Sequence, residues 1–522
     1  MKLKKTILNI LTAFVISSLL FTGCSKSDDN TPVIESVSLN NEVNDFIWRG
    51  LNDVYLWQSD VPNLGDTKFF SNNDYVTFYN SYDTTENLSQ DIIADYFTFL
   101  NKYNNPTELF DALLYKKDDI DKFSYLVDDY VALENSFQGT SKSSGLDFGL
   151  VRLSGSNDIL GYVRYIAKNS DAANKDIYRG DFFLEVDGQQ LTINNYQELL
   201  FGSNDNFTLG MADITNNIVA INGKTVALTK TEFTEDPILI NDIIEINGHT
   251  IAYLMYNQFI GDFDNALNDV FAEFKAQGAT DLILDLRYNP GGRVSTAVAL
   301  ASMITGQFTE DIFASAQWNS KYQAYFSSNN PEFLNDRFTD KLADNSSINM
   351  LNLTKVYILT TTGTASASEL IINGLDPYID VIHIGTRTTG KYTASVTLYD
   401  ANNFDKEKAN PNHKYAMQPL VYKSANKNGV SDYYNGLVPD HIITYQTANG
   451  ETQEGENLVN LGILGNINEP FLNKAVELIT GTSTKNNMDR TGIKIKHVAD
   501  TKDFAPLGKR MFDNLDFKML ER

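Results

Sequence analysis

The sequence predicts an α/β domain built from strand–helix–strand units, preceded by a β-rich module and a small helical domain. Two patterns support this: period-two alternation of apolar residues over 139–233, and apolar strands alternating with helical patterns after Asn247. Length is the third observation, because 522 residues exceed what a single core usually organises. We therefore expect several domains in one chain.

The helical domain is expected over residues 43–138. Apolar and aromatic residues beginning at Phe46 recur there at helical spacing, in pieces through Leu133. Residues 24–42 precede it and are rich in Ser, Asp and Asn. Such polar segments bury little surface, so we expect a flexible tether.

The β-rich module is expected over residues 139–233. Short alternating runs bounded by Gly and Asn are typical of strands. The expected strands cover residues 149–153, 160–166, 181–186 and 218–228, the last with a turn at Asn222-Gly223.

The α/β domain is expected over residues 234–480. Its first unit has a helix beginning after Asp262, a possible cap, and ending at Gly278. The expected strands cover residues 251–256, 282–287, 356–360 and 381–385, and further helices cover 294–304 and 365–375. This order implies a buried sheet with crossover helices. Residues 481–522 form a polar, basic-leaning tail that gives no structural prediction.

The N-terminus has the pattern of an export signal, expected over residues 1–23. Lysines precede an apolar stretch at residues 7–21, which is shorter than the ~20 residues of a membrane helix and interrupted by polar residues. Cys24, the only cysteine, follows Thr22-Gly23 in a pattern that resembles the lipobox of bacterial lipoproteins. That resemblance implies lipidation of Cys24 and an outer-membrane anchor; a retained helix and soluble secretion are the alternatives.

Charge and composition exclude other classes of function. The formal net charge of −25 repels phosphate backbones and argues against a nucleic-acid partner. No cluster of His, Cys, Asp and Glu has metal-ligand spacing in the sequence, so we expect neither a metal nor another cofactor.

Three loops after predicted strands carry the candidate chemistry, at the place where open α/β sheets usually hold their sites. In Asp285–Gly292, paired glycines let backbone N–H groups face a developing negative charge. In Thr364–Glu369, small residues keep the Ser366 hydroxyl accessible at a helix N-terminus. Lys391 follows a strand that returns the chain alongside Ser366. Separately, each has an ordinary alternative: a turn, a helix cap and a solvated cation.

Together these motifs resemble the carboxyl-terminal processing (tail-specific) serine peptidases. The resemblance covers about residues 139–480 and rests on Asp-Leu-Arg-x-Asn-x-Gly-Gly, Thr-Ala-Ser-Ala-Ser-Glu and Gly-Lys in this order. It implies a catalytic domain of crotonase-like β-β-α units, with Ser366 as nucleophile and Lys391 as general base. It also implies an oxyanion hole formed by the N–H of Ala367 with that of Gly291 or Gly292. Ser395 stands where the family usually has a positioning Gln, and Tyr392 where it has Gly.

The β-rich module resembles a PDZ domain. The residues that carry this resemblance are Ser170–Ala173, Arg179–Gly188 and the expected helix at 193–200. It implies a groove in which a bound peptide adds a strand to the sheet. The groove would include Leu146, Phe148 and Gly149, with Asp147 in the loop where such domains capture a carboxylate. The alternative is a module that only gates or braces the catalytic domain.

The expected function is that of an exported serine endopeptidase acting on proteins or peptides through a Ser-Lys dyad and an acyl-enzyme. Desolvation would favour the neutral amine that Lys391 needs as a base. A non-catalytic peptide- or lipid-binding lipoprotein on the same scaffold is the alternative. A histidine triad is a further rival, although the five histidines lie in no motif that pairs with Ser366. Asp28-Asp29, after Lys26, resembles the acidic signals that send some lipoproteins to the cell surface, and this resemblance implies surface exposure.

Overall fold

The computed structural model describes residues 37–81, 88–153, 155–216, 218–482, 492–504, 508 and 511–513. The export signal, Cys24 and most of the tether lie outside these residues and stay predictions. Within the described residues, no helix has both the length and the apolar character needed to cross a membrane.

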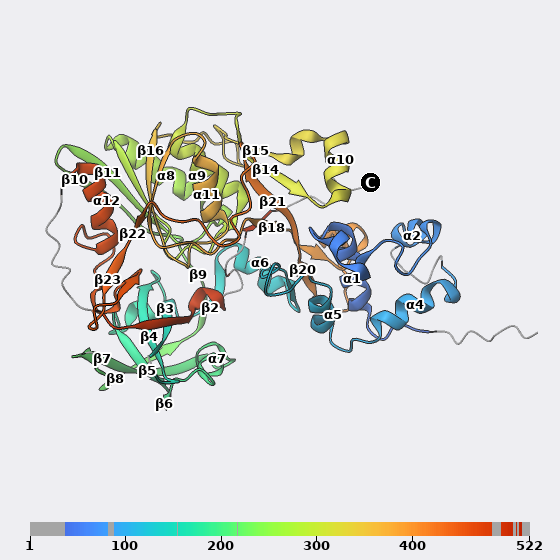
Figure 1. Cartoon of the computed structure of the whole chain (residues 1–522), viewed down its shortest axis with the longest axis horizontal. Helices are drawn as coiled ribbons and strands as arrows, with labels where there is room; N and C mark the ends of the chain where they lie inside the picture. The colour runs from blue at the N-terminus through green and yellow to red at the C-terminus, as the bar shows by residue number, and fades with distance from the viewer. Residues whose placement is uncertain are drawn as a thin grey trace, which may run out of the picture.

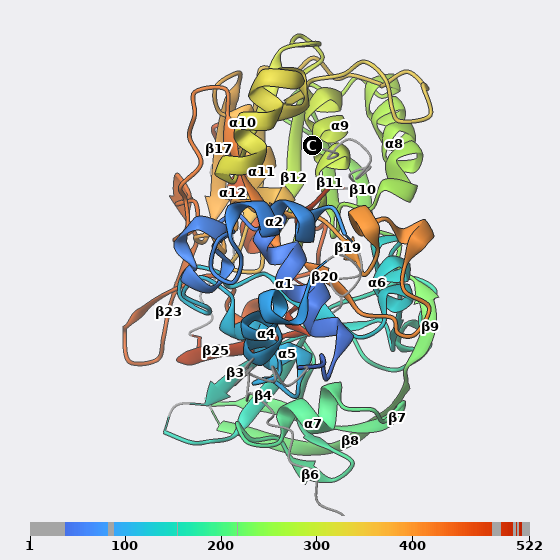
Figure 2. The ribbon, with the colours of Figure 1, turned by 90° about the vertical axis from the view of Figure 1, so that its right-hand side faces the viewer.

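Helices follow the tether, as the sequence predicts. They are α1 (Glu42–Val54), α2 (Asn72–Tyr79), α4 (Gln90–Leu100), α5 (Pro106–Ala112) and α6 (Tyr130–Phe137), with short 3-10 turns between α1 and α2. Asn41 caps α1 by accepting from the N–H of Val43. Trp48 is fully buried and makes edge contacts with Phe78 and Tyr96. Helices α1, α2, α4 and α5 lie on the right-hand side of Figure 1, the side that faces the viewer in Figure 2, and α6 lies nearer the centre.

The β-rich unit is a seven-stranded antiparallel sheet. Its order is β25-β3-β4-β5-β7-β8, with β6 beside β5. The strands are β3 (Leu146–Leu153), β4 (Ile159–Ile166), β5 (Phe182–Val186), β6 (Gln189–Gln190), β7 (Asn206–Thr215), β8 (Ile218–Thr229) and β25 (Ile495–Asp500). Helix α7 (Tyr196–Phe201) packs on this sheet, and β2 (Thr140–Ser143) pairs with β9 (Thr231–Thr234) at its base.

One prediction for this unit is wrong, and one of its strands was not predicted. The expected turn at Asn222-Gly223 is wrong, because β8 continues through it. Instead, the register between β7 and β8 shifts at this point. Gly223 has a φ of 83°, so the glycine permits an irregularity within the strand. The tail also contributes a strand, β25, to the edge of β3, which the sequence analysis did not predict.

The α/β domain has the expected alternation of strands and helices. Its sheet has the order β10-β11-β12-β16-β17-β22, parallel except for β10. The strands are β10 (Ile238–Ile246), β11 (His249–Tyr256), β12 (Asp281–Asp285), β16 (Lys355–Thr360), β17 (Asp380–Gly385) and β22 (His441–Ile442). Helices α8 (Asp264–Ala276), α9 (Val294–Thr305) and α11 (Ala367–Leu375) share a core with one face, and α12 (Pro470–Thr480) covers the other (Figure 1).

Three element ends differ from the prediction. Helix α8 starts after a 3-10 turn with Phe263 at its N-cap, so Asp262 is not the cap. Strand β12 ends at Asp285 rather than at residue 287. Helix α11 starts at Ala367 rather than at residue 365, because Ser366 has a backbone conformation that is not helical.

A second six-stranded sheet, not predicted from the sequence, packs beside α9 and α11 (Figure 1). Its order is β13-β26-β18-β21-β14-β15. The strands are β13 (Gly292–Arg293), β26 (Met511–Phe512), β18 (Thr393–Ser395), β21 (Leu420–Asn426), β14 (Ile312–Trp318) and β15 (Asn335–Arg337). A small three-stranded sheet has the order β1 (Tyr125–Val127), β20 (Ala416–Gln418) and β19 (Leu398–Tyr399). Strands β23 (Thr444–Gln446) and β24 (Thr452–Glu454) form a hairpin, and the remaining helix is α10 (Ser320–Asn329).

Buried charges connect the β-rich unit to the α/β domain. Arg287 has no exposed surface and pairs with Asp285 at 2.7 Å and Glu469 at 2.7 Å. Arg179, from the β-rich unit, pairs with Glu456 at 2.9 Å and donates to the hydroxyl of Tyr288 at 2.7 Å. The loop that begins at Arg287 is therefore held from both units.

Replacing Arg287 with Met should strongly destabilise the fold. The substitution keeps most of the side-chain volume but leaves the carboxylates of Asp285 and Glu469 buried without their cation, which typically costs about 3–5 kcal/mol. Urea unfolding of both proteins at neutral pH measures the difference. Lys355→Met is the control, since its pair with Asp380 is largely exposed and should contribute less than about 1 kcal/mol. Equal effects of the two substitutions would contradict the prediction.

Candidate active site

Ser366 lies at the junction of β16 and α11 in a strained backbone conformation. Its φ is 68° and its ψ is −119°, a region that residues other than glycine rarely adopt. Such strain costs on the order of 1–3 kcal/mol and is concentrated at functional sites. The residue is fully buried, and its Oγ has no hydrogen-bond partner among the described residues. The hydroxyl is therefore not used as a helix cap.

Glu369, in the first turn of α11, connects the serine loop to the lysine loop. Its Oε2 accepts from the N–H of Ser366 and from the N–H of Lys391, each at 2.8 Å. Its Oε1 accepts from the N–H of Gly390 at 2.6 Å and from the hydroxyl of Thr388 at 2.5 Å. Complete burial raises the pKa of this carboxyl, and the donated hydrogen bonds oppose that shift. One carboxylate thus fixes the backbone of both predicted catalytic residues.

Lys391 is also buried, with 1% of its surface exposed. Gly390, with a φ of 97°, allows the turn that brings it back from β17, since a Cβ there would lie 2.4 Å from the carbonyl oxygen of Tyr434. The Nζ of Lys391 donates to the carbonyl of Met511 at 3.4 Å and lies 5.5 Å from the centre of the Phe123 ring. The side-chain nitrogen of Lys391 therefore lies inside the protein, next to strand β26.

The predicted oxyanion-hole residues border the same place. Ala367 is the first residue of α11, where backbone N–H groups lack an acceptor within the helix. Gly291 donates its N–H to Oδ1 of Asn289 at 2.9 Å. Gly292 begins β13 with a φ of 139°, and a Cβ there would lie 2.2 Å from the carbonyl oxygen of Phe259. The N–H of Gly291 already has an acceptor and Gly292 pairs with Met511 of β26, so both glycines stay candidates for the second donor.

Ser395 lies on β18 and connects to a residue that the sequence analysis missed. Its Oγ donates to Oε1 of Gln418 at 2.6 Å and is 3.2 Å from the carbonyl oxygen of Met511. Gln418 is fully buried on β20. No local sequence pattern marks this glutamine as a site residue. It comes close to Ser395 only because β18 and β20 each pair with strands from other parts of the chain.

The histidines are engaged away from Ser366. His383 is buried on β17 with Nε2 at 2.6 Å from the Thr360 hydroxyl, and burial lowers its pKa to about 4. His249 and His413 pair with Asp281 and Asp400.

One group departs from the expectation that no metal-ligand cluster exists. The ligand atoms of His497, Asp500 and Asp503 lie within 4.8 Å of one another on the tail. The end of β25 and the 3-10 turn at Thr501–Asp503 bring these side chains together, which spacing within a motif does not reveal. Asp500 already pairs with buried Arg164 at 3.0 Å, so proximity alone does not make this group a metal site.

The predicted peptide-binding residues lie at the start of β3. Leu146 and Phe148 line a cavity of about 750 Å³ that also contacts Phe201 of α7. Gly149 pairs with Tyr162 on one side and with Asp500 of β25 on the other. Asp147, in the expected carboxylate loop, pairs with Arg164 at 2.5 Å, so its charge is balanced within the β-rich unit.

Two family models match the chain. "Peptidase family S41" matches residues 250–468, and "Peptidase S41 N-terminal domain" matches residues 42–125, together more than half of the 522 residues. The first includes Ser366, Glu369 and Lys391.

Similar proteins include two named carboxyl-terminal processing proteases. That of Picosynechococcus sp. is 25% identical over 201 residues, 36% of this chain and 44% of that protein. That of Bartonella bacilliformis is 24% identical over 237 residues, 43% of this chain and 47% of that protein. The matched region thus spans less than half of each relative.

One solved structure supports the fold. A crystal structure of a Bacteroides fragilis protein assigned to the S41 proteases superposes with a TM-score of 0.58 at 22% identity, covering 84% of this chain and 97% of that one. At this identity the likeness establishes the architecture alone.

Glu369→Gln should disturb the backbone of both loops. An amide has one acceptor oxygen, so its NH₂ group would face two of the four donors that the carboxylate now accepts. We expect covalent labelling of Ser366 by a fluorophosphonate to slow on the order of 100-fold, as small misplacements of reacting groups do. Exposed Glu454→Gln is the control. A labelling rate within twofold of the parent would refute a positioning role for Glu369.

Proposed function

The chain belongs to peptidase family S41, and on this premise we propose that it is a serine endopeptidase that cuts polypeptides through Ser366 and Lys391. The observation that carries the proposal is the Glu369 carboxylate, which accepts from the backbone N–H groups of both residues. An unpartnered buried hydroxyl and a buried amine side chain are held on loops that share one anchor. This arrangement suits a nucleophile and its base.

The proposed reaction follows acyl transfer. Oγ of Ser366 attacks the carbonyl carbon of the scissile bond while the neutral amine of Lys391 takes its proton. The N–H of Ala367, with that of Gly291 or Gly292, faces the oxygen that becomes negative. Lys391 then returns the proton to the leaving amine, and water hydrolyses the ester on Ser366 with the same base.

The β-rich unit supports a second part of the proposal, namely that it binds extended peptide. The cavity beside Leu146 and Phe148 lies between β3 and α7, where a peptide could add a strand. Arg164 neutralises Asp147 there, which removes one obstacle to an acidic chain end. We further propose export and an outer-membrane lipid anchor, on the basis of the Cys24 motif.

Ser366→Ala should abolish proteolysis of an unfolded substrate such as casein, with the fold retained. Loss of a nucleophile typically costs on the order of 10⁶ in turnover. Ser368→Ala is the matched control, because Oγ of Ser368 donates to the carbonyl of Asn289 at 3.1 Å and serves local structure. If Ser368→Ala were the inactive variant and Ser366→Ala the active one, the assignment of the nucleophile would be wrong.

Lys391→Arg should be as inactive as Lys391→Ala. A guanidinium keeps the charge and much of the length of the side chain but stays protonated in proteins, so it cannot accept the proton of Ser366. His383→Gln should keep most activity, since this histidine bonds Thr360 in the core. Initial rates on casein measure all three variants. A working Lys391→Arg enzyme would exclude the dyad.

A further inference from the structure

The tail of this chain lies on the edge of the proposed peptide-binding unit. Strand β25 pairs antiparallel with β3, from Ile495 opposite Leu153 to Asp500 opposite Gly149. It therefore runs toward the start of β3, the end at which the cavity opens. A peptide that adds to this sheet edge needs the same backbone groups of β3.

Side chains of the tail also enter the cavity beside α7. The ring of Phe504 stacks on Phe201 with centroids 4.0 Å apart, and it lines the cavity. Thr501 donates its hydroxyl to Asp147 at 2.6 Å. The tail thus uses an apolar contact and a polar contact on the surface proposed for peptides.

Farther along, the tail enters the candidate active site as strand β26. Met511 pairs with Gly292 of β13 and Phe512 with Ser395 of β18, so β26 lies between these two strands. The N–H of Asp513 donates to the carbonyl of Ser395 at 3.0 Å. The carbonyl of Met511 accepts from the Nζ of Lys391 at 3.4 Å. A main-chain carbonyl of the tail is therefore in contact with the proposed base.

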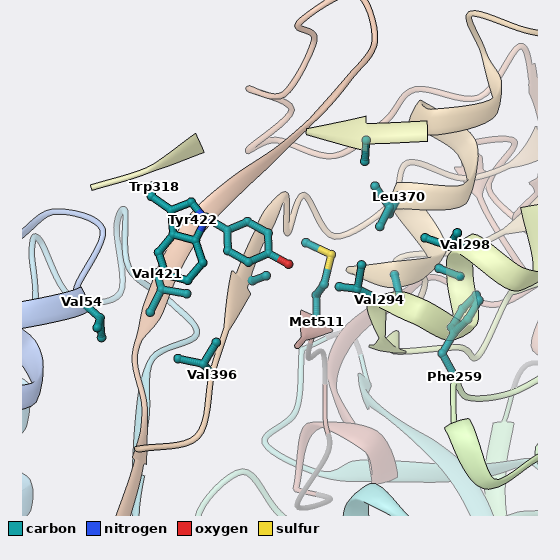
Figure 3. Close-up of a cluster of buried hydrophobic side chains, with 14 of the residues drawn as sticks. Val54, Phe259, Val294, Val298, Trp318, Leu370, Val396, Val421, Tyr422 and Met511 are labelled. Carbon is teal, nitrogen blue, oxygen red and sulfur yellow. The ribbon is translucent and has the colours of Figure 1, made fainter. Parts of the chain in front are cut away.

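Buried side chains hold this strand in place. Met511 has no exposed surface and, in the close-up of the core, lies between Tyr422 on one side and Val294 on the other (Figure 3). Phe512 is 2% exposed and stacks on Phe137 with centroids 4.1 Å apart. The contact is a packed one with a defined register.

We propose that residues 495–504 and 511–513 form an intramolecular, substrate-like inhibitor, which other polypeptides must displace to reach Ser366. The inference rests on the proposed function and specifies how the same site is regulated. An extended substrate and β26 cannot both lie between β13 and β18, because each strand edge bonds one neighbour at a time. A tethered segment also competes at an effective concentration on the order of millimolar.

Phe512→Asp in the full chain should weaken this inhibition. An aspartate carboxylate cannot replace the ring in its buried stack on Phe137 without a large desolvation penalty. We expect the initial rate on casein to rise about 10-fold or more, as expected when a tethered competitor is released. Ile218→Asp is the matched control, since Ile218 is 68% exposed on β8. A Phe512→Asp rate equal to that of the control would overturn the proposal.

A disulfide tests occupancy separately from activity. Arg293 and Phe512 are paired residues on adjacent strands, so cysteines at both positions have a separation suited to a disulfide. In a Cys24→Ser background, oxidation of Arg293→Cys/Phe512→Cys should form the bond, seen by mass, and lower the casein rate at least 10-fold. Dithiothreitol should restore it, while the two single variants should respond to neither reagent.

The outcomes separate the inference from the function on which it rests. Full activity of the oxidised protein, with the disulfide verified, would overturn the inhibitor and leave the peptidase standing. Failure of the disulfide to form would place the tail elsewhere and overturn it too. A disulfide that forms in a protein inactive in both redox states, with Ser366 unreactive toward fluorophosphonate in the parent chain, would overturn the proposed function and the inhibitor together.

Discussion

The carboxylate of Glu369 accepts hydrogen bonds from four donors on two loops, and the rest of the candidate site depends on it. It fixes the N–H of Ser366, whose positive φ is a conformation that needs support from its surroundings. It also fixes Gly390 and Lys391, which the chain reaches only after crossing β17. Because the group is fully buried, water cannot replace the bonds it makes, so the strain at Ser366 and the position of Lys391 are maintained by the same interaction.

Buried ion pairs anchor a second loop of the candidate site, the one that carries the two predicted oxyanion-hole glycines. Arg287, Arg179 and Arg164 surround the ring of Tyr288, at 5.9, 5.8 and 4.8 Å from its centre. Each guanidinium is paired with a buried carboxylate from elsewhere in the chain. The loop that leads to Gly291 and Gly292 is thus anchored at its base by contacts from the β-rich unit, and a displacement of that unit would be transmitted to the glycines.

The sequence predicted the elements whose signal is local. Apolar runs between helical patterns located β11, β16 and β17, and the small residues around Ser366 marked a strand-to-helix junction that the structure contains. It did not predict the role of Glu369, because a glutamate in the first helical turn also has an ordinary explanation as a capping residue. Gln418, β25 and β26 were missed for another reason. They reach their places through pairing between distant segments, and no periodicity in the tail records its partners.

Strand β26 has a consequence for the order in which the molecule assembles. It lies inside its sheet, between β13 and β18, and it pairs with β13 from more than two hundred residues earlier in the chain. Pairing between strands so far apart in the sequence is slow, because the chain loses the entropy of closing the loop before it gains the free energy of the contact. Until residues 511–513 have been made, β13 and β18 have no strand between them, and their open edges are the kind that attract foreign chains. The pairing of β26 therefore both completes the core around Met511 and closes that exposed pair of edges.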